Sequence, residues 1–198
     1  MKEIAALAAG YIIGSLCFSI IASMLIYGKD VRKKGSGNAG ATNMARSFGL
    51  AAGIITLAGD ALKCVAALWL GKRLCGNTGV LLGGVGCILG HCYPVFFRFQ
   101  GGKGVAVGVA LLYMVSWKIG VISTVVFLAA AVLSRKVSVG SVSAAAAAAI
   151  SLFLFRLPAE LSILVVFLSV LVIFRHRENI QRLIKGEEPD FSFHKTHS

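Results

Sequence analysis

Charged residues are scarce in this sequence, and acidic residues are the scarcest. Only 14% of the 198 residues are charged, and 8 Asp and Glu stand against 20 Lys and Arg. Proline is rare, at 3 residues, whereas hydrophobic residues make up 57% of the chain. A soluble domain typically carries about 25% charged residues, so the composition excludes an ordinary soluble fold and indicates a membrane protein.

Paired cysteines and clusters of metal ligands are missing as well. The five cysteines are an odd number, none has the C-x-x-C spacing, and four lie within apolar runs. They are therefore predicted to be small buried hydrophobic residues, not disulfide partners or metal ligands. His91 has no second His, Asp or Glu at ligand spacing, so we expect it to hydrogen-bond between helices and we expect no metal site.

Apolar runs of membrane-spanning length recur along the whole chain, separated by polar, glycine or proline signals. We therefore expect one all-α integral membrane domain over residues 1–198, with seven transmembrane helices. The expected spans cover roughly residues 4–27, 48–71, 78–97, 104–117, 119–133, 141–157 and 159–174. The fourth and fifth are shorter than the roughly 20 residues that a crossing helix needs. Residues 104–133 therefore admit a second interpretation, as one span interrupted by Lys118.

The distribution of basic residues favours seven spans over six. With seven spans, one side of the membrane holds 14 of the 20 Lys and Arg residues, in segments 28–47, 98–103, 134–140 and 175–198. Basic loops face the cytoplasm, so the N-terminus is predicted outside and the C-terminus inside. The same pattern argues against nucleic acid as a partner, because basic residues between apolar spans suit an anionic lipid surface. The first span lacks a convincing cleavage site and is expected to stay attached.

The first unusual polar segment is GSGNAGATNMAR, which directly follows the first span. It formally contains G-x-G-x-x-G, but a dinucleotide-binding motif must follow a strand in a soluble βαβ unit. Closely spaced glycines that expose backbone N–H groups, with neutral hydrogen-bonding side chains and one arginine, suit a phosphate instead. A flexible cytoplasmic turn is the alternative. The predicted phosphate-binding residues here are Gly35, Ser36, Gly37, Asn38, Thr42, Asn43 and Arg46.

The second segment is FQGGKGVAV, at the start of the fourth span. Phe97 occupies the position of the first Walker A glycine and no Ser or Thr follows the lysine, so this is not a P-loop. A glycine-flanked lysine at a helix N-terminus still makes a cationic, amide-rich anion site. A positive-inside lysine among packing glycines is the alternative. The predicted phosphate-binding residues are Gly101, Gly102, Lys103 and Gly104.

The third segment is RHRENIQRL, at the cytoplasmic end of the last span. Arg175, Arg177 and Arg182 could anchor the helix end by snorkelling to the interface. Such an anchor needs neither His176 nor Asn179, so these two residues point to anion binding instead. All three segments lie on the same predicted face.

Several other polar residues have a structural interpretation. Asp60 and Lys63 are three residues apart within a span, so mutual neutralisation is favoured over a role in a pocket or proton relay. The pairs Gly79/Gly83 and Gly86/Gly90 are typical of close helix packing. A serine cluster beside Arg135 and Lys136 lies on the predicted active face. Its members are Ser138, Ser141 and Ser143.

The three segments together, in this order and on one face, resemble the bacterial membrane acyltransferase family that transfers an acyl chain from acyl phosphate to glycerol 3-phosphate. The resemblance covers nearly the whole chain. It implies seven helices, a cytoplasmic active site in the bacterial plasma membrane, lysophosphatidic acid as product, and no need for metal, coenzyme A or other cofactor. We also expect a monomer. Val107 departs from the family, many members of which have threonine there. The catalytic residues that the resemblance implies are Ser36, Arg46, Lys103, Ser141, His176 and Asn179.

The expected chemistry is the gathering of two anionic substrates, because acyl phosphate already carries a good leaving group. No Ser-His-Asp arrangement and no H-x-x-x-x-D signature is evident, so the resemblance points to a substrate phosphate oxygen as proton acceptor. The main rival is a transporter of a small phosphorylated anion with Asp60 and Lys63 in its pathway. A third interpretation, a non-catalytic anionic-lipid binder, explains the positive charge but not the neutral Ser and Asn residues.

Overall fold

The computed structural model describes residues 1–191, and within them the regular structure is helical, with no strand. The all-α prediction is thereby confirmed. The elements are α1 (Lys2–Gly14), α2 (Phe18–Tyr27), η1 (Val31–Lys33), α3 (Ala41–Phe48), α4 (Leu50–Cys92), η2 (Val95–Phe97), α5 (Val105–Val115), α6 (Trp117–Ser134), α7 (Val137–Ser151), α8 (Ala159–Arg175) and α9 (Arg177–Ile184).

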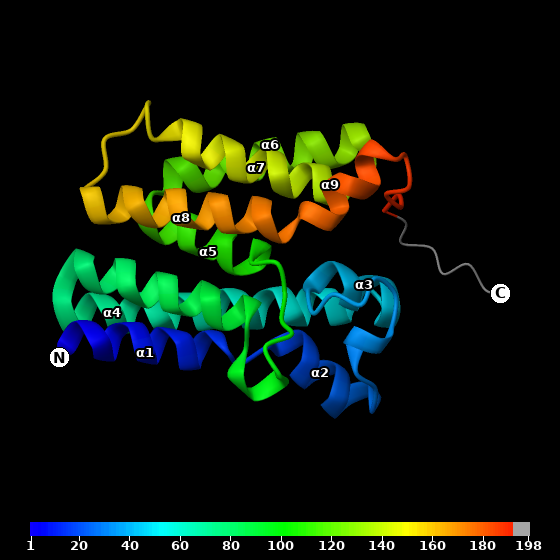
Figure 1. Ribbon diagram of the computed structural model, residues 1–198, viewed down its shortest axis with the longest axis horizontal. Helices are drawn as coiled ribbons and strands as arrows, with labels where there is room; N and C mark the ends of the chain where they lie inside the picture. The colour runs from blue at the N-terminus through cyan, green and yellow to red at the C-terminus, as the bar shows by residue number, and fades with distance from the viewer. Residues whose placement is uncertain (192–198) are drawn as a thin grey trace.

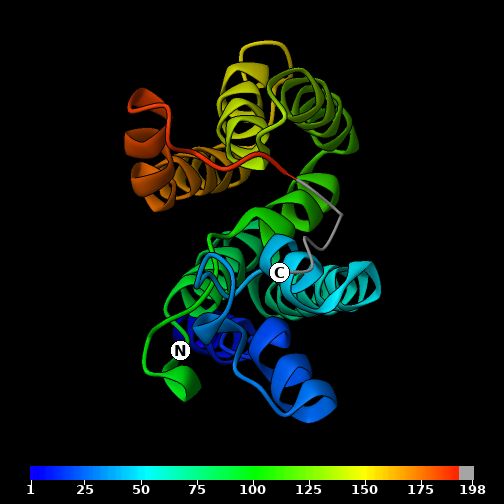
Figure 2. The same ribbon diagram turned by 90° about the vertical axis from the view of Figure 1, so that its right-hand side faces the viewer.

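The long helices run roughly along one axis, and the short helices α3 and α9 lie at the same end of the bundle (Figure 1). The N-terminus and the connection between α7 and α8 lie at the opposite end. Figure 2 shows α5 between one group made of α1, α2 and α4 and another made of α6, α7 and α8. The three polar segments therefore gather at one end, as the predicted shared face requires.

The long helix α4 consists of two helices joined by a tight reversal. Cys75 and Gly76 have non-helical backbone angles, and Gly76 takes a positive φ of 60° that favours glycine. Backbone atoms of Gly71 and Gly79 then meet so closely that neither position has room for a Cβ. The two halves match the expected spans 48–71 and 78–97. The second ends at Cys92 instead of residue 97, because Pro94 cannot continue the helix and instead caps the separate helix η2.

Small residues set the contact between α1 and the second half of α4. A Cβ at Gly10 or Gly14 would overlap the backbone of Gly83 or Cys87, and one at Gly86 would overlap that of Leu7. The predicted close packing through the α4 glycines is confirmed. Such contacts bring backbones together in a membrane, where apolar side chains gain little from leaving lipid.

Two further expected spans differ from the structure. The span 4–27 is broken between α1 and α2, and the carbonyl of Leu16 at the break accepts a hydrogen bond from Lys63 Nζ at 2.8 Å. The break leaves the Leu16 carbonyl without a partner in the helix, and the buried Lys63 supplies the missing hydrogen bond. The span 141–157 is shifted, because α7 already begins at Val137, after Arg135 ends α6 with a φ of 57°.

Three helical stretches among residues 1–191 are long and apolar enough to cross a membrane: Lys2–Tyr27, Leu50–Phe97 and Trp117–Ser134. The pair α8 and α9, bent by 51°, makes a fourth if it counts as one span. Helices α5 and α7 are apolar but shorter. The many exposed Leu, Ile, Val and Phe side chains fit a surface that faces lipid.

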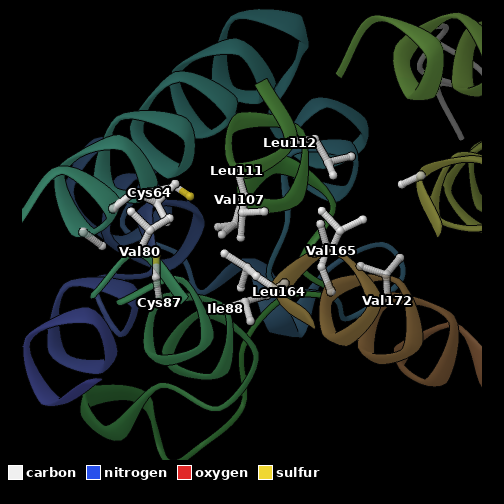
Figure 3. Packing of buried hydrophobic residues seen from close by; sticks show 14 of the residues in the cluster. Cys64, Val80, Cys87, Ile88, Val107, Leu111, Leu112, Leu164, Val165 and Val172 are labelled. Atoms are coloured by element: carbon white, nitrogen blue, oxygen red, sulfur yellow. The ribbon is translucent and has the colours of Figure 1, made fainter. Parts of the chain in front are cut away.

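The buried core is centred on α5 (Figure 3). Val107 and Leu111 of α5 are fully buried in one cluster with Ile88 of α4 and Leu164 of α8. All five cysteines are free, and every one except Cys75 is buried. The prediction that they act as small apolar residues is confirmed for those four.

Candidate active site

The three polar segments meet around one cavity of about 410 Å³. All six residues predicted to be catalytic line it, and so do three further predicted phosphate-binding residues, Asn38, Thr42 and Asn43. Gly37 and Gly101 line a neighbouring pocket of about 350 Å³, which shares Ser36, Asn38, Lys103 and Arg182 with the first. Gly35, Gly102 and Gly104 line neither and shape the loops.

Asn43 organises the first loop from the start of α3. Its Nδ2 lies 3.0–3.1 Å from the carbonyl oxygens of Val31, Lys34 and Asn38, among which its two hydrogens are shared, and its Oδ1 accepts a hydrogen bond from the Ser36 amide at 3.0 Å. Asn43 therefore holds the loop that carries Ser36 and Asn38. Its predicted contact with a phosphate stays a prediction.

The second loop is fixed by backbone contacts that only glycine permits. The Gly101 and Gly102 amides donate to the carbonyls of Cys92 and His91 at 3.2 and 3.0 Å, and Arg175 Nη2 donates to the Gly102 carbonyl at 3.1 Å. A Cβ at Gly102 would overlap the His91 ring. These contacts place Lys103 at the cavity wall.

The third segment bends the chain at His176, between α8 and α9. His176 is 4% exposed, and its Nδ1 lies 2.8 Å from the Val172 carbonyl, so Nδ1 carries the proton. Burial lowers the pKa of His176 to about 4, against the opposing effect of that carbonyl. The ring is therefore neutral at physiological pH, with Nε2 free to accept a hydrogen bond.

Lys103 and Asn179 connect the second and third segments. Lys103 Nζ donates to Asn179 Oδ1. Burial, helped by the nearby charge of Arg182, lowers the pKa of Lys103 to about 8. Because the ammonium is poorly hydrated there, an anionic ligand that reaches it gains a strong, little-screened contact.

Glu188, beyond α9, is a site residue that sequence reasoning missed. Its carboxylate accepts hydrogen bonds from Ser138 Oγ and Asn179 Nδ2, both at 2.6 Å, and from Arg182 Nε at 2.8 Å. Burial alone would raise the pKa of Glu188, but these donors outweigh it and lower the pKa. Nothing local in the sequence distinguishes Glu188 from its exposed neighbour Glu187.

The lining of the main cavity combines cationic and apolar side chains. Its cationic groups come from Arg46 of α3, Arg182 of α9 and Lys103, which donates to Asn179 of α9. Apolar side chains from α4, α5 and α6 line it as well. They are Leu57, Val105, Ala106, Val109, Phe127 and Leu128. Leu57 and Leu128 are also about half exposed on the outer surface, so the apolar part borders the face expected to contact lipid. Such a cavity suits an amphiphile with an anionic head group.

Asp60 and Lys63 form the ion pair that the sequence predicted. Asp60 Oδ1 lies 2.7 Å from Lys63 Nζ, and Lys63 Nζ lies 3.1 Å from His91 Nδ1. His91 therefore links the two halves of α4, as expected. Asp60 and His91 also line the main cavity, a placement that mutual neutralisation alone does not require. Among the described residues, no group of three or more His, Cys, Asp or Glu side chains could hold a metal ion.

The profile of the family described as glycerol-3-phosphate acyltransferase matches residues 4–186. The chain belongs to this family. It is 40% identical over 188 residues to a glycerol-3-phosphate acyltransferase of Carboxydothermus hydrogenoformans, an alignment that covers 95% of each chain. It is 44% identical over 186 residues to one from Caulobacter vibrioides, covering 93% of this chain and 85% of that one. The chain is therefore an acyltransferase, which removes the transporter and lipid-binder alternatives.

Two solved structures share the fold. Both are crystal structures of PlsY, an integral membrane glycerol 3-phosphate acyltransferase. Its glycerol 3-phosphate form matches with a TM-score of 0.91 at 34% identity, covering 97% of this chain and 96% of that one. Its lysophosphatidic acid form matches with a TM-score of 0.88 at 32% identity, covering 98% of this chain and 97% of that one. The present chain is an all-helical integral membrane enzyme.

Proposed function

We propose that the enzyme transfers an acyl chain from acyl phosphate to glycerol 3-phosphate, releasing 1-acylglycerol 3-phosphate and inorganic phosphate. The observation that carries this proposal is that one cavity is lined both by the cationic side chains of Arg46, Lys103 and Arg182 and by apolar side chains of α4, α5 and α6. An acyl phosphate fits with its phosphate at Arg46 and Lys103 and its chain along α4, α5 and α6. The water-soluble acceptor arrives through the neighbouring polar pocket, which shares Lys103 with the main cavity.

The reaction needs little covalent chemistry from the protein. The C1 hydroxyl oxygen of the acceptor attacks the acyl carbon, and the bond between that carbon and the phosphate oxygen breaks. The two phosphates repel each other, so bringing them together is the main obstacle. Arg46 and Lys103 offset this repulsion and stabilise the charge that grows on the departing phosphate, while Ser36 and Asn38 add neutral hydrogen bonds.

The hydroxyl proton moves to an oxygen of the departing phosphate. The alternative acceptor among the predicted site residues is neutral His176, whose free Nε2 has the chemistry of a base. We infer that Nε2 instead accepts a hydrogen bond from the newly protonated phosphate. Asn179 keeps Lys103 in place through its Oδ1, and Ser141, which donates to the Val137 carbonyl at 2.9 Å, presents its oxygen at the cavity wall.

We further infer that the chain crosses a bacterial plasma membrane seven times as one domain, with the active site on the cytoplasmic side. The crossings are α1 with α2, the two halves of α4, and α5, α6, α7 and α8. An odd number of crossings agrees with the start of α1 and the helix α9 lying at opposite ends of the bundle (Figure 1), and the basic segments then face the cytoplasm. One chain supplies every predicted catalytic residue, which supports activity as a monomer.

An assay with purified enzyme tests the reaction. Acyl phosphate and glycerol 3-phosphate together are expected to release inorganic phosphate and form lysophosphatidic acid, whereas acyl coenzyme A is not expected to replace acyl phosphate. Lys103→Ala is expected to lose most of this activity. Lys185→Ala, which removes an exposed lysine outside both pockets, is the matched control. Equal activity with acyl coenzyme A would contradict the proposed donor.

A further inference from the structure

The mechanism above gives no role to Asp60, although this residue forms part of the cavity wall. Its side chain is 0% exposed, and Oδ1 is engaged by Lys63 at 2.7 Å. Oδ2 has no hydrogen-bond partner within residues 1–191. Buried carboxylate oxygens are nearly always hydrogen-bonded, because an unmet acceptor in a dry interior is costly. Neutralising Lys63 therefore accounts for only one of the two oxygens.

The chemistry of Oδ2 restricts what can bind it. A carboxylate oxygen repels a phosphate, and the acyl chain has no donor to offer. Of the two proposed substrates, only the glycerol moiety carries hydroxyl groups. Lys63 holds Oδ1, and rotation of the carboxylate would move both oxygens, so a hydroxyl in the cavity has to approach Oδ2 in its present position.

The two hydroxyls of glycerol 3-phosphate have different tasks. The C1 hydroxyl forms the ester and gives its proton to the departing phosphate, so that proton is committed. The C2 hydroxyl keeps its proton and remains available as a donor. We propose that Asp60 Oδ2 accepts a hydrogen bond from the C2 hydroxyl and so selects acceptors that carry one. This inference rests on the proposed reaction.

The surroundings of Asp60 suit such a selecting role. Lys63 Nζ is held by the Leu16 carbonyl at 2.8 Å and lies 3.1 Å from His91 Nδ1, so the ion pair has little freedom to move. His91 in turn packs against Gly102, beside Lys103. One rigid cluster thus couples the position of Asp60 to the lysine that is proposed to bind phosphate, which fixes the spacing between the two contacts.

The test compares glycerol 3-phosphate with 3-hydroxypropyl phosphate, which has the reacting hydroxyl but no C2 hydroxyl. With wild-type enzyme and acyl phosphate, kcat/KM for the analogue is expected to be about 10- to 150-fold lower than kcat/KM for glycerol 3-phosphate. This is the usual effect of one hydrogen bond to a charged group. Equal use of both acceptors by the wild type would overturn the proposal. Failure to use glycerol 3-phosphate at all would instead contradict the proposed reaction.

Two variants separate recognition from folding. Asp60→Glu keeps Lys63 paired but moves the accepting carboxylate oxygen. This variant is expected to lower kcat/KM for glycerol 3-phosphate more than kcat/KM for the analogue. Asp60→Ala/Lys63→Met removes the acceptor without leaving a buried lysine unpaired, and it is expected to use both acceptors within about 3-fold of each other. Ser169→Ala removes a buried, unpartnered hydroxyl that lines neither pocket and is expected to keep the wild-type ratio. An undiminished preference for glycerol 3-phosphate in either folded Asp60 variant would overturn the proposal.

Discussion

Lys103 and His176 show how burial adjusts individual residues for anion chemistry. Burial shifts the pKa of each toward the neutral form, to about 8 for Lys103 and about 4 for His176. At neutral pH Lys103 remains largely protonated and can bind a phosphate, whereas His176 is uncharged. The two residues therefore offer different chemistry in the same cavity, a cation and a neutral acceptor.

Lys103 predicts how the activity of the enzyme falls on the alkaline side of its pH profile. The ammonium form, which is proposed to bind phosphate, is lost as the pH rises through about 8, so kcat/KM for glycerol 3-phosphate should fall above that pH. Steady-state kinetics between pH 6.5 and 9.5 measure this fall. Lys103→Arg, which stays charged throughout, should be less active but should lack the fall near pH 8. If the wild type and Lys103→Arg both showed the fall of kcat/KM near pH 8, the fall would belong to another group.

His176 distinguishes substrate assistance from base catalysis. A lost general base typically costs about 10²- to 10⁴-fold in rate, and small amines then restore activity. We expect His176→Ala to lower kcat by about 10-fold, the cost of one neutral hydrogen bond, with no recovery in added imidazole. The measurement is kcat with and without imidazole on protein shown to be folded. Recovery of kcat would make His176 the base.

At the scale of elements, the segment after α9 joins two helices that are distant in sequence. Glu188 accepts hydrogen bonds from Ser138 of α7 and from Asn179 and Arg182 of α9. Lys136 Nζ donates to the Glu188 carbonyl at 2.6 Å. Since Asn179 also accepts from Lys103, this short segment supports the geometry of the site without itself being proposed to bind substrate.

Adjacent acidic residues allow a matched test of this support. Glu188→Gln weakens three charge-assisted hydrogen bonds, and we expect it to lower kcat at least 10-fold and to lower the Tm. Glu187→Gln makes the same substitution at an exposed residue and should change neither kcat nor the Tm. Thermal unfolding in detergent and phosphate-release assays give both readouts. Because hydrogen bonds lower the pKa of Glu188, its stabilising effect should be present at neutral pH and disappear as the pH falls through that lowered pKa.

For the whole molecule, the arrangement of basic segments makes a topological prediction. A tag at the C-terminus and a cysteine placed at Gly37, near the polar pocket, should be inaccessible from outside intact cells, whereas Cys75 at the α4 reversal should be accessible. Labelling with an impermeant thiol reagent measures this, with permeabilised cells as control. Labelling of the Gly37 position from outside would contradict the cytoplasmic active site.

Much of the fold was predictable because lipid imposes strong local rules. A segment that crosses a membrane must satisfy its backbone internally, so apolar runs predicted helices and their order. The run at residues 4–27 was interpreted as one helix, since the break at Leu16 depends on Lys63, 47 positions later. The start of α7 was also missed, because serine is common both in loops and in the first turns of helices.

The sequence by itself determined the helical membrane architecture, the positions of the three segments that are predicted to bind anions, and the family, because spacing and composition along the chain carry that information. Only the tertiary structure decided which side chains share one cavity. It assigned Asn43 to support of a loop, made Glu188 a central acceptor and left one oxygen of Asp60 without a partner. These roles depend on contacts between residues far apart in the sequence, and such contacts exist only when the helices have packed.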